Sequence, residues 1–272
     1  MGKMHDFLIR CRMTQMVSNK HLLHIIKLSF SSPNIESAGL AYLHRELEPE
    51  KFNQFLLLLS KADSSNILAI NYLDDYYPEQ LRNIYNPPAI LFYRGNKNLL
   101  LTSCLAIVGS RNATSYSHGC VQGLVPKLVD RYTIVSGLAR GVDSWAHMAA
   151  LNNSGKTIAV IGSSLEISYP KENQQLQNTI GQQGLLLSEY PPGSKINRWH
   201  FPQRNRIIAG LCQKVVVTEA KLRSGALITA ELALDSNRDV YAIPGRIDSS
   251  PSAGCNKLIQ EGAIPLINFN EI

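Results

Sequence analysis

The chain has 272 residues, of which 44% are hydrophobic and 18% charged, so it can bury a full core and is not a disordered or low-complexity protein. Its net charge of +6 and its pI near 9.0 favour an anionic partner only mildly. The five cysteines are odd in number and form no C-x-x-C pair, and no apolar run is long enough to cross a bilayer. These features predict a cytoplasmic protein with neither a disulfide framework nor a thiolate metal site.

The N-terminal part of the chain is predicted to be helical. Up to about residue 59, apolar residues recur at helical spacing, as at Leu22, Leu23, Ile25 and Ile26. We therefore expect a small helical domain over residues 1–65. Residues 66–104 are expected to connect it to a sheet, with a short Pro-initiated helix near 76–81 and a strand at 89–93, which follows two prolines.

From residue 105 onward, short β-branched runs alternate with helical stretches. The runs lie at 105–108, 132–135, 157–161, 185–187, 214–217 and 239–243. Helix candidates lie between them, near 115–130, 142–153, 171–182, 203–211 and 224–236. Connections of this length join parallel strands. The sequence therefore predicts an α/β fold, with a doubly wound and mostly parallel sheet over residues 105–272.

The ends of the first strands carry glycines and arginines. Gly109 and Arg111 follow the first strand, and Gly137 and Arg140 follow the second. Ligands of doubly wound sheets bind at the carboxyl ends of the strands, where backbone N–H groups and helix dipoles attract anions. Each turn alone is better explained by a tight connection, but two adjacent turns with an arginine favour an anion. Neither is a G-x-G-x-x-G motif, so no dinucleotide cofactor is predicted.

Residues 199–210 mix aromatic and basic side chains without an acidic one. Four cations lie between residues 195 and 210, namely Lys195, Arg198, Arg204 and Arg206. Single-stranded nucleic acid fits this mixture, because its phosphates need cations and its unstacked bases need ring partners. The alternative is a turn at Phe201 that packs into the core beside solvated arginines.

Signatures of enzymes and metal sites are weak. Residues 150–157 resemble a P-loop only superficially, because Ala150 replaces its first glycine and the helix precedes the strand. His21 and His24 lack a third ligand nearby, so no metal site is predicted. Asp143 is expected to cap the helix that follows it, and His147, one turn later, either meets a phosphate or packs inside.

Taken in order, these segments resemble the DNA-processing protein A family, also called DprA or Smf. The resemblance spans about residues 76–263 and rests on residues 108–111, 136–143, 157–162, 169–173, 188–193, 199–210, 224–230, 244–245 and 254–256. It implies an extended Rossmann-like domain that binds single-stranded DNA, behind a small helical, SAM-like N-terminal domain. It also implies protection of incoming strands during natural transformation, loading of RecA, homodimers, and no known catalysis or cofactor.

The family's functional positions carry over to three groups of residues. The implied DNA groove comprises Gly109, Ser110, Arg111, Gly137, Arg140, Gly141, Lys171, Asn173, Arg198, Phe201, Arg204, Asn205 and Arg206. Candidates for RecA contact, whose alternative is a solvated helix, are Glu231, Leu234, Asp235 and Asp239. Candidates for the dimer contact are Asn256, Leu258, Ile259, Ile264 and Leu266. Stacking of bases on Trp199 or Phe201 stays open against inward packing.

Two departures and one competing function accompany the resemblance. The family usually has G-x-G-x-D after the third strand, where this chain has Ser164 and Glu166, and we expect the Cβ of Ser164 to restrict that turn. No C-terminal winged helix is expected after residue 267. The alternative is a nucleotide phosphoribohydrolase that uses Glu219 or Glu231, but residues 224–231 lack the paired glycines of its signature.

Overall fold

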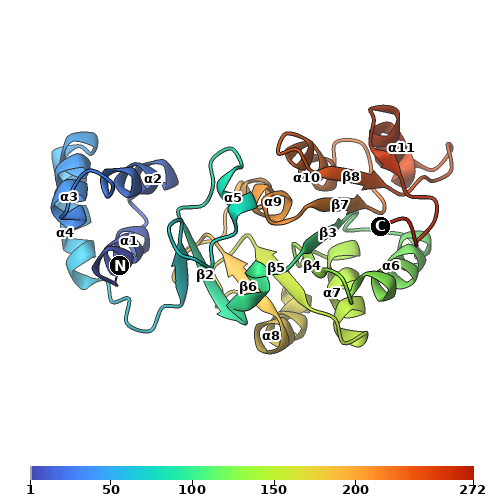
Figure 1. The fold of residues 1–272 in the computed structure, drawn as a ribbon, viewed down its shortest axis with the longest axis horizontal. Helices are drawn as coiled ribbons and strands as arrows, with labels where there is room; N and C mark the ends of the chain where they lie inside the picture. The colour runs from blue at the N-terminus through green and yellow to red at the C-terminus, as the bar shows by residue number, and fades with distance from the viewer. Residues whose placement is uncertain (1) are drawn as a thin grey trace.

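The computed structural model describes residues 2–272, which form a helical N-terminal domain beside a large sheet covered by helices on both faces (Figure 1). The N-terminal helices are α1 (Gly2–Met13), α2 (Asn19–Leu28), α3 (Ile35–Glu46) and α4 (Pro49–Lys61). Ser18 and Asn34 cap α2 and α3 by accepting backbone N–H groups, and Pro49 opens α4. No helix in the described residues is long and apolar enough to span a bilayer.

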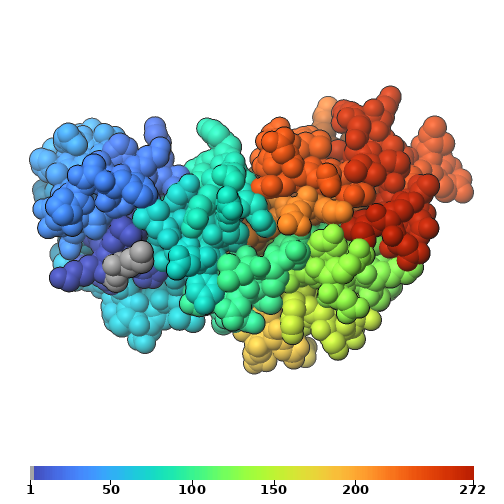
Figure 2. All heavy atoms as spheres, in the orientation of Figure 1, coloured from blue at the N-terminus to red at the C-terminus, as the bar shows by residue number. Residues whose placement is uncertain are grey.

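The segment expected to connect the two parts also contributes to the sheet. It contains β1 (Ala69–Asn71), α5 (Glu79–Arg82), β2 (Ile90–Gly95) and a 3-10 helix, η1 (Lys97–Leu101). Strand β1 pairs with β2, and β2 pairs with β6, both antiparallel. The space-filling view shows this segment, in cyan, lying against the blue helical domain (Figure 2). The sequence did not reveal β1, because three residues are too few to show alternation.

The rest of the chain alternates strands and helices as the sequence predicts. In order it has β3 (Cys104–Val108), α6 (Ser115–Leu128), β4 (Thr133–Ser136), α7 (Val142–Asn152), β5 (Thr157–Ile161), η2 (Lys171–Asn173), α8 (Gln174–Gln183), β6 (Leu185–Ser188), α9 (His200–Leu211), β7 (Lys214–Val217), α10 (Gly225–Leu234), β8 (Asp239–Ala242), η3 (Ser250–Ser252), α11 (Ala253–Gln260) and β9 (Ile264–Pro265). The strand order is β1-β2-β6-β5-β4-β3-β7-β8-β9, and β3 to β9 are parallel. The predicted α/β, mostly parallel sheet is confirmed.

Both faces of the parallel sheet are buried, which explains its continuous apolar strands. Ala106 and Val108 of β3 face the layer of α9, α10 and α11, whereas Leu105 and Ile107 face α6 and α7 (Figure 1). Strand β3 lies between β4 and β7. The chain therefore adds strands on one side of β3 first, from β4 to β6, and on its other side later, from β7 onward. This switch point is where open α/β sheets form a ligand crevice.

Candidate nucleic-acid interface

Two adjoining hollows open at the carboxyl ends of the parallel strands. The first, of about 360 Å³, lies between the turn after β3 and the start of α10. The second, of about 550 Å³, lies between the turns after β4 and β5 and the segment before η2. Four residues line both hollows, namely Arg111, Ala139, Phe201 and Arg204. We call the two hollows together the strand-end groove.

Glycines allow the backbone to approach closely around this groove. Gly141 has φ +71°, and a Cβ there would lie 2.4 Å from the carbonyl oxygen of Ser110. At Gly137 a Cβ would lie 2.4 Å from Nη1 of Arg204. A side chain at position 137 would therefore displace the arginine that both hollows share.

Arg204 is buried, yet it lines the groove. Its Nη1 donates to the carbonyl oxygens of Gly137, at 2.5 Å, and of Val160, and its Nε donates to Oδ1 of Asn205 at 3.2 Å. Burial lowers the pKa of Arg204 to about 10, so the guanidinium stays charged at neutral pH. Among the described residues Nη2 has no hydrogen-bond partner, so this group can serve a ligand in the groove.

Asp143 organises the turn after β4 instead of capping its own helix. Its Oδ2 accepts the N–H groups of Gly137, at 3.1 Å, and of Ala139, at 3.4 Å, and Gly141 occupies the cap position of α7. The expectation of an Asp143 cap is therefore wrong. Burial raises the pKa of Asp143, and the nearby Arg204 opposes that rise. The carboxyl group holds in place the turn that carries Gly137.

The exposed cations expected at the groove lie at or beside it. Arg111, Arg140 and Lys171 line the hollows and are exposed, whereas Arg198 is exposed but lies outside their lining. Arg140 forms an exposed ion pair with Glu172, which raises the pKa of Arg140. Lys221, an exposed cation after β7, also lines the first hollow, although it was not among the predicted DNA-binding residues. Its position just after a strand could have identified it as a residue of the groove.

Of the two large aromatic residues in 199–210, Phe201 lies inside the groove and Trp199 lies outside it. Phe201 is half-buried, lies against Tyr169 at 5.1 Å between ring centroids, and has the Arg111 guanidinium 5.9 Å from its ring centre. A Cβ at Gly162 would meet its ring at 2.9 Å. Trp199 is 55% exposed and packs edge-on against His200, outside both hollows.

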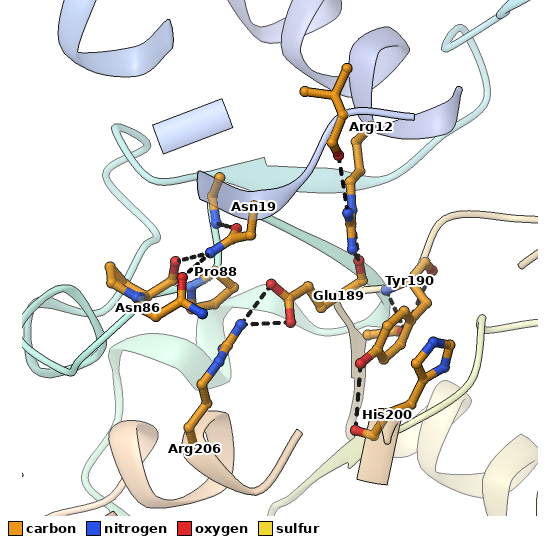
Figure 3. A network of polar contacts seen from close by, with 12 residues as sticks. Arg12, Asn19, Asn86, Pro88, Glu189, Tyr190, His200 and Arg206 are labelled. Carbon is orange, nitrogen blue, oxygen red and sulfur yellow. Dashed lines mark hydrogen bonds and ion pairs between the residues drawn. The ribbon is translucent and has the colours of Figure 1, made fainter. Parts of the chain in front are cut away.

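Arg206 was expected to bind a DNA phosphate, but it is paired with a carboxylate of the protein. Its Nη2 donates to both carboxylate oxygens of Glu189 at 2.7 Å, and both residues are buried (Figure 3). The backbone carbonyl of Glu189 accepts two hydrogen bonds from Arg12 of α1, at 3.0 and 3.2 Å. Arg206 therefore belongs to the junction with the helical domain, because a paired buried arginine has no free face for DNA.

Three polar residues shape turns or pack inside. The side-chain amide of Asn173 donates to the carbonyl of Leu138 at 2.9 Å, and that of Asn205 donates to Gly225 at 3.2 Å. His147 is fully buried, with Nδ1 2.6 Å from Oγ1 of Thr157. Of its two expected alternatives, the structure shows inward packing.

The loop after β5 accommodates its unusual residues. Ser164 is fully buried and is not among the described residues with positive φ, so its Cβ causes no backbone strain. Glu166 accepts the N–H of Gly193 at 2.6 Å through Oε1. This bond joins the loop after β5 to the loop after β6.

The glutamates considered for catalysis are placed for other roles. The buried carboxylate of Glu219 accepts the N–H and hydroxyl of Thr114 at 2.7 and 2.8 Å, which fastens the start of α6. Glu231 is exposed on α10 and lines neither hollow. Within residues 2–272, no three His, Cys, Asp or Glu side chains gather as a metal site would require.

The residues considered for protein contacts differ in exposure. Glu231, Leu234, Asp235 and Asp239 are exposed, as a contact surface needs. Leu258 and Leu266 are only 4% and 2% exposed, so they pack in the core of their own domain instead of facing a partner. Asn256 exchanges hydrogen bonds with Gly245 at 3.0 and 3.1 Å, and Ile259 is half-buried. Only Ile264 of the apolar dimer candidates is exposed, at 44%.

Comparisons with known proteins agree with this architecture. The family profile described as DNA recombination-mediator protein A matches residues 68–272. The chain belongs to this family. DNA processing protein DprA of Streptococcus pneumoniae is 53% identical over 195 residues, which cover 72% of this chain and 69% of that protein. DprA of Bacillus subtilis is 38% identical over 273 residues, covering 96% of this chain and 92% of that protein.

Solved structures extend the similarity to both parts of the chain. The X-ray structure of DprA from Streptococcus pneumoniae superposes with a TM-score of 0.86 at 40% identity, covering 97% of this chain and 95% of that one. A structure of DNA processing protein A from Helicobacter pylori, described for its single-stranded DNA binding mode, has a TM-score of 0.68 at 32% identity. It covers 75% of this chain and 92% of that one. The resemblance found in the sequence is confirmed.

Proposed function

We propose that this chain binds single-stranded DNA in the strand-end groove and acts as a non-catalytic recombination mediator that helps to load RecA. The observation that carries the proposal is the shared wall of the two hollows, where Arg111, Arg204 and Phe201 meet. Membership of the recombination-mediator family and the DNA-binding Helicobacter pylori relative support it.

The chemistry of the wall suits a single strand better than a duplex. Cations supply the charge that phosphates need, and this attraction weakens with salt. The ring of Phe201 offers a face only to a base that is free of its complementary strand. Gly109 and Ser110 keep the backbone close to a strand in the first hollow, and Lys171 continues the positive charge into the second hollow, where Arg140 is paired with Glu172.

Protein partners belong to the same proposal. The exposed acidic and apolar mixture of Glu231, Leu234, Asp235 and Asp239 supports a RecA contact. The exposed Ile264, with Ile267 at 76% exposure, supports a homodimer contact near the C-terminus. The buried free thiols of all five cysteines are in keeping with work in the cytoplasm during transformation.

A competition titration tests the DNA-binding step. A labelled oligo-dT is titrated with the protein at two salt concentrations, and unlabelled oligo-dT or a duplex of equal length then competes. We expect the single strand to compete far better, and its affinity to fall as salt rises. Equal competition by the duplex, or an affinity that ignores salt, would contradict the proposal.

A further inference from the structure

A second basic and aromatic surface lies on the N-terminal domain, outside the strand-end groove. It is a hollow of about 480 Å³ between α2 and the loop that precedes β2. Tyr85 stands in this loop and is 96% exposed. The residues that line the hollow include no acidic side chain and are Lys20, Leu23, His24, Lys27, Tyr42, Tyr85 and Asn86. We call it the α2 hollow.

Asn19 fixes the two sides of the α2 hollow to each other. Its Nδ2 donates to Oδ1 of Asn86 and to the carbonyl of Pro87, both at 2.8 Å, and its Oδ1 accepts the N–H of Ala89 at 2.7 Å (Figure 3). Asn86 has a left-handed φ of +55°, a conformation that asparagine tolerates. The loop that presents Tyr85 is therefore held in place, which reduces the entropy that binding would cost.

The α2 hollow lies beyond the strand-end groove, on the same side of the sheet, where the parallel strands end. Strand β2 is antiparallel to β6, and Phe92 pairs with Ser188, the last residue of β6. The residues before Phe92 therefore extend past the carboxyl end of β6, as does the segment with the exposed Arg198 and Trp199. From β3 across β4, β5 and β6 to β2 there are four strand spacings. At about 4.8 Å each, they span roughly 19 Å.

We propose that the α2 hollow is a second subsite for single-stranded DNA, reached by the same strand after it leaves the strand-end groove across Arg198 and Trp199. Lys20 and Lys27 supply charge for phosphates, and Tyr85 supplies a face for a base. The inference rests on the proposed function, because the groove provides the first part of the path. The lining of lysines and tyrosines without an acidic side chain favours DNA over a protein as the occupant.

Binding measured against oligonucleotide length tests this subsite. Oligo-dT of increasing length is titrated with the wild-type protein, with Tyr85→Ser, and with Lys20→Gln/Lys27→Gln. Short oligomers that fill only the groove should bind all three proteins equally. On long oligomers, Tyr85→Ser should lose about 5- to 150-fold in affinity, the range for one stacked base. The double variant should lower the slope of log affinity against log salt by about 1.4, since each phosphate contact contributes about 0.7.

Two controls keep the test decisive. Lys51→Gln/Lys61→Gln removes the same charge from the exposed face of α4 and should leave the length dependence unchanged. Photocrosslinking with oligomers that carry 5-iododeoxyuridine should label Tyr85 with long strands and not with short ones. The same length dependence in all variants, together with no crosslink to Tyr85, would overturn the subsite. If the wild-type protein failed to bind even short oligomers, the proposed function itself would fail instead.

Discussion

Arg204 and Arg206 are two residues apart in α9, yet they belong to two regions with different uses of charge. Arg204 faces the strand-end groove, where its guanidinium donates hydrogen bonds only to neutral protein groups, although the carboxyl group of Asp143 lies nearby. Arg206 faces the junction with the helical domain, where Glu189 neutralises it. A buried arginine is therefore available to a polyanion only where no carboxylate of the protein is bonded to it.

The largest expected effect comes from breaking the pair at the junction. Glu189→Ala should cost about 3–5 kcal/mol of unfolding free energy, because it leaves the buried charge of Arg206 without a partner. Urea denaturation measures this loss. The matched control is Glu172→Ala, which removes the exposed partner of Arg140 and should leave stability unchanged. Equal losses in the two variants would contradict the contrast between a buried and an exposed pair.

A smaller effect is expected where the groove is closely packed. Gly137→Ala should cost about 1–3 kcal/mol, because its Cβ pushes against the guanidinium of Arg204. It should also weaken binding of oligo-dT in anisotropy titrations. Gly119→Ala is the control, since nothing lies within 4 Å of its Cβ. In the middle of α6, alanine should instead add about 0.5–1 kcal/mol. Unchanged stability and binding in Gly137→Ala would show that Arg204 is mobile.

The buried histidine makes stability depend on pH. Burial lowers the pKa of His147 to about 3, whereas the unfolded chain titrates near 6.5. Between these values the unfolded state binds one more proton, so stability falls as pH falls below about 6.5. From pH 6.5 to 5.5 the loss should be about 1 kcal/mol. The raised pKa of Asp143 acts in the opposite direction at pH values above its usual pKa of 3.8. Thermal unfolding of His147→Gln should show a smaller loss, because the buried His200, whose pKa is also lowered, still contributes. An identical pH profile in the variant would contradict this account.

The sequence predicted the sheet well because its parallel strands are buried on both faces and separated by full helices. It did not predict β1, which is too short for a pattern. Arg204 and Arg206 were both predicted to line the DNA groove, although residues two apart on a helix point in nearly opposite directions. That spacing was a signal for separating them. The sequence could not show that Glu189 pairs with Arg206 or that Leu266 is buried, because both depend on contacts between distant segments.

The central claim, that DNA follows the carboxyl ends of the strands, is tested most directly by the salt dependence of oligo-dT binding in two double variants. Arg111→Gln/Lys171→Gln removes cations from the groove. Lys127→Gln/Lys156→Gln removes the same charge near the amino ends of β4 and β5. We predict that the first pair lowers the salt slope by about 1.4 and weakens binding, while the second changes neither. Equal changes in both pairs, or normal affinity in the first, would contradict the account.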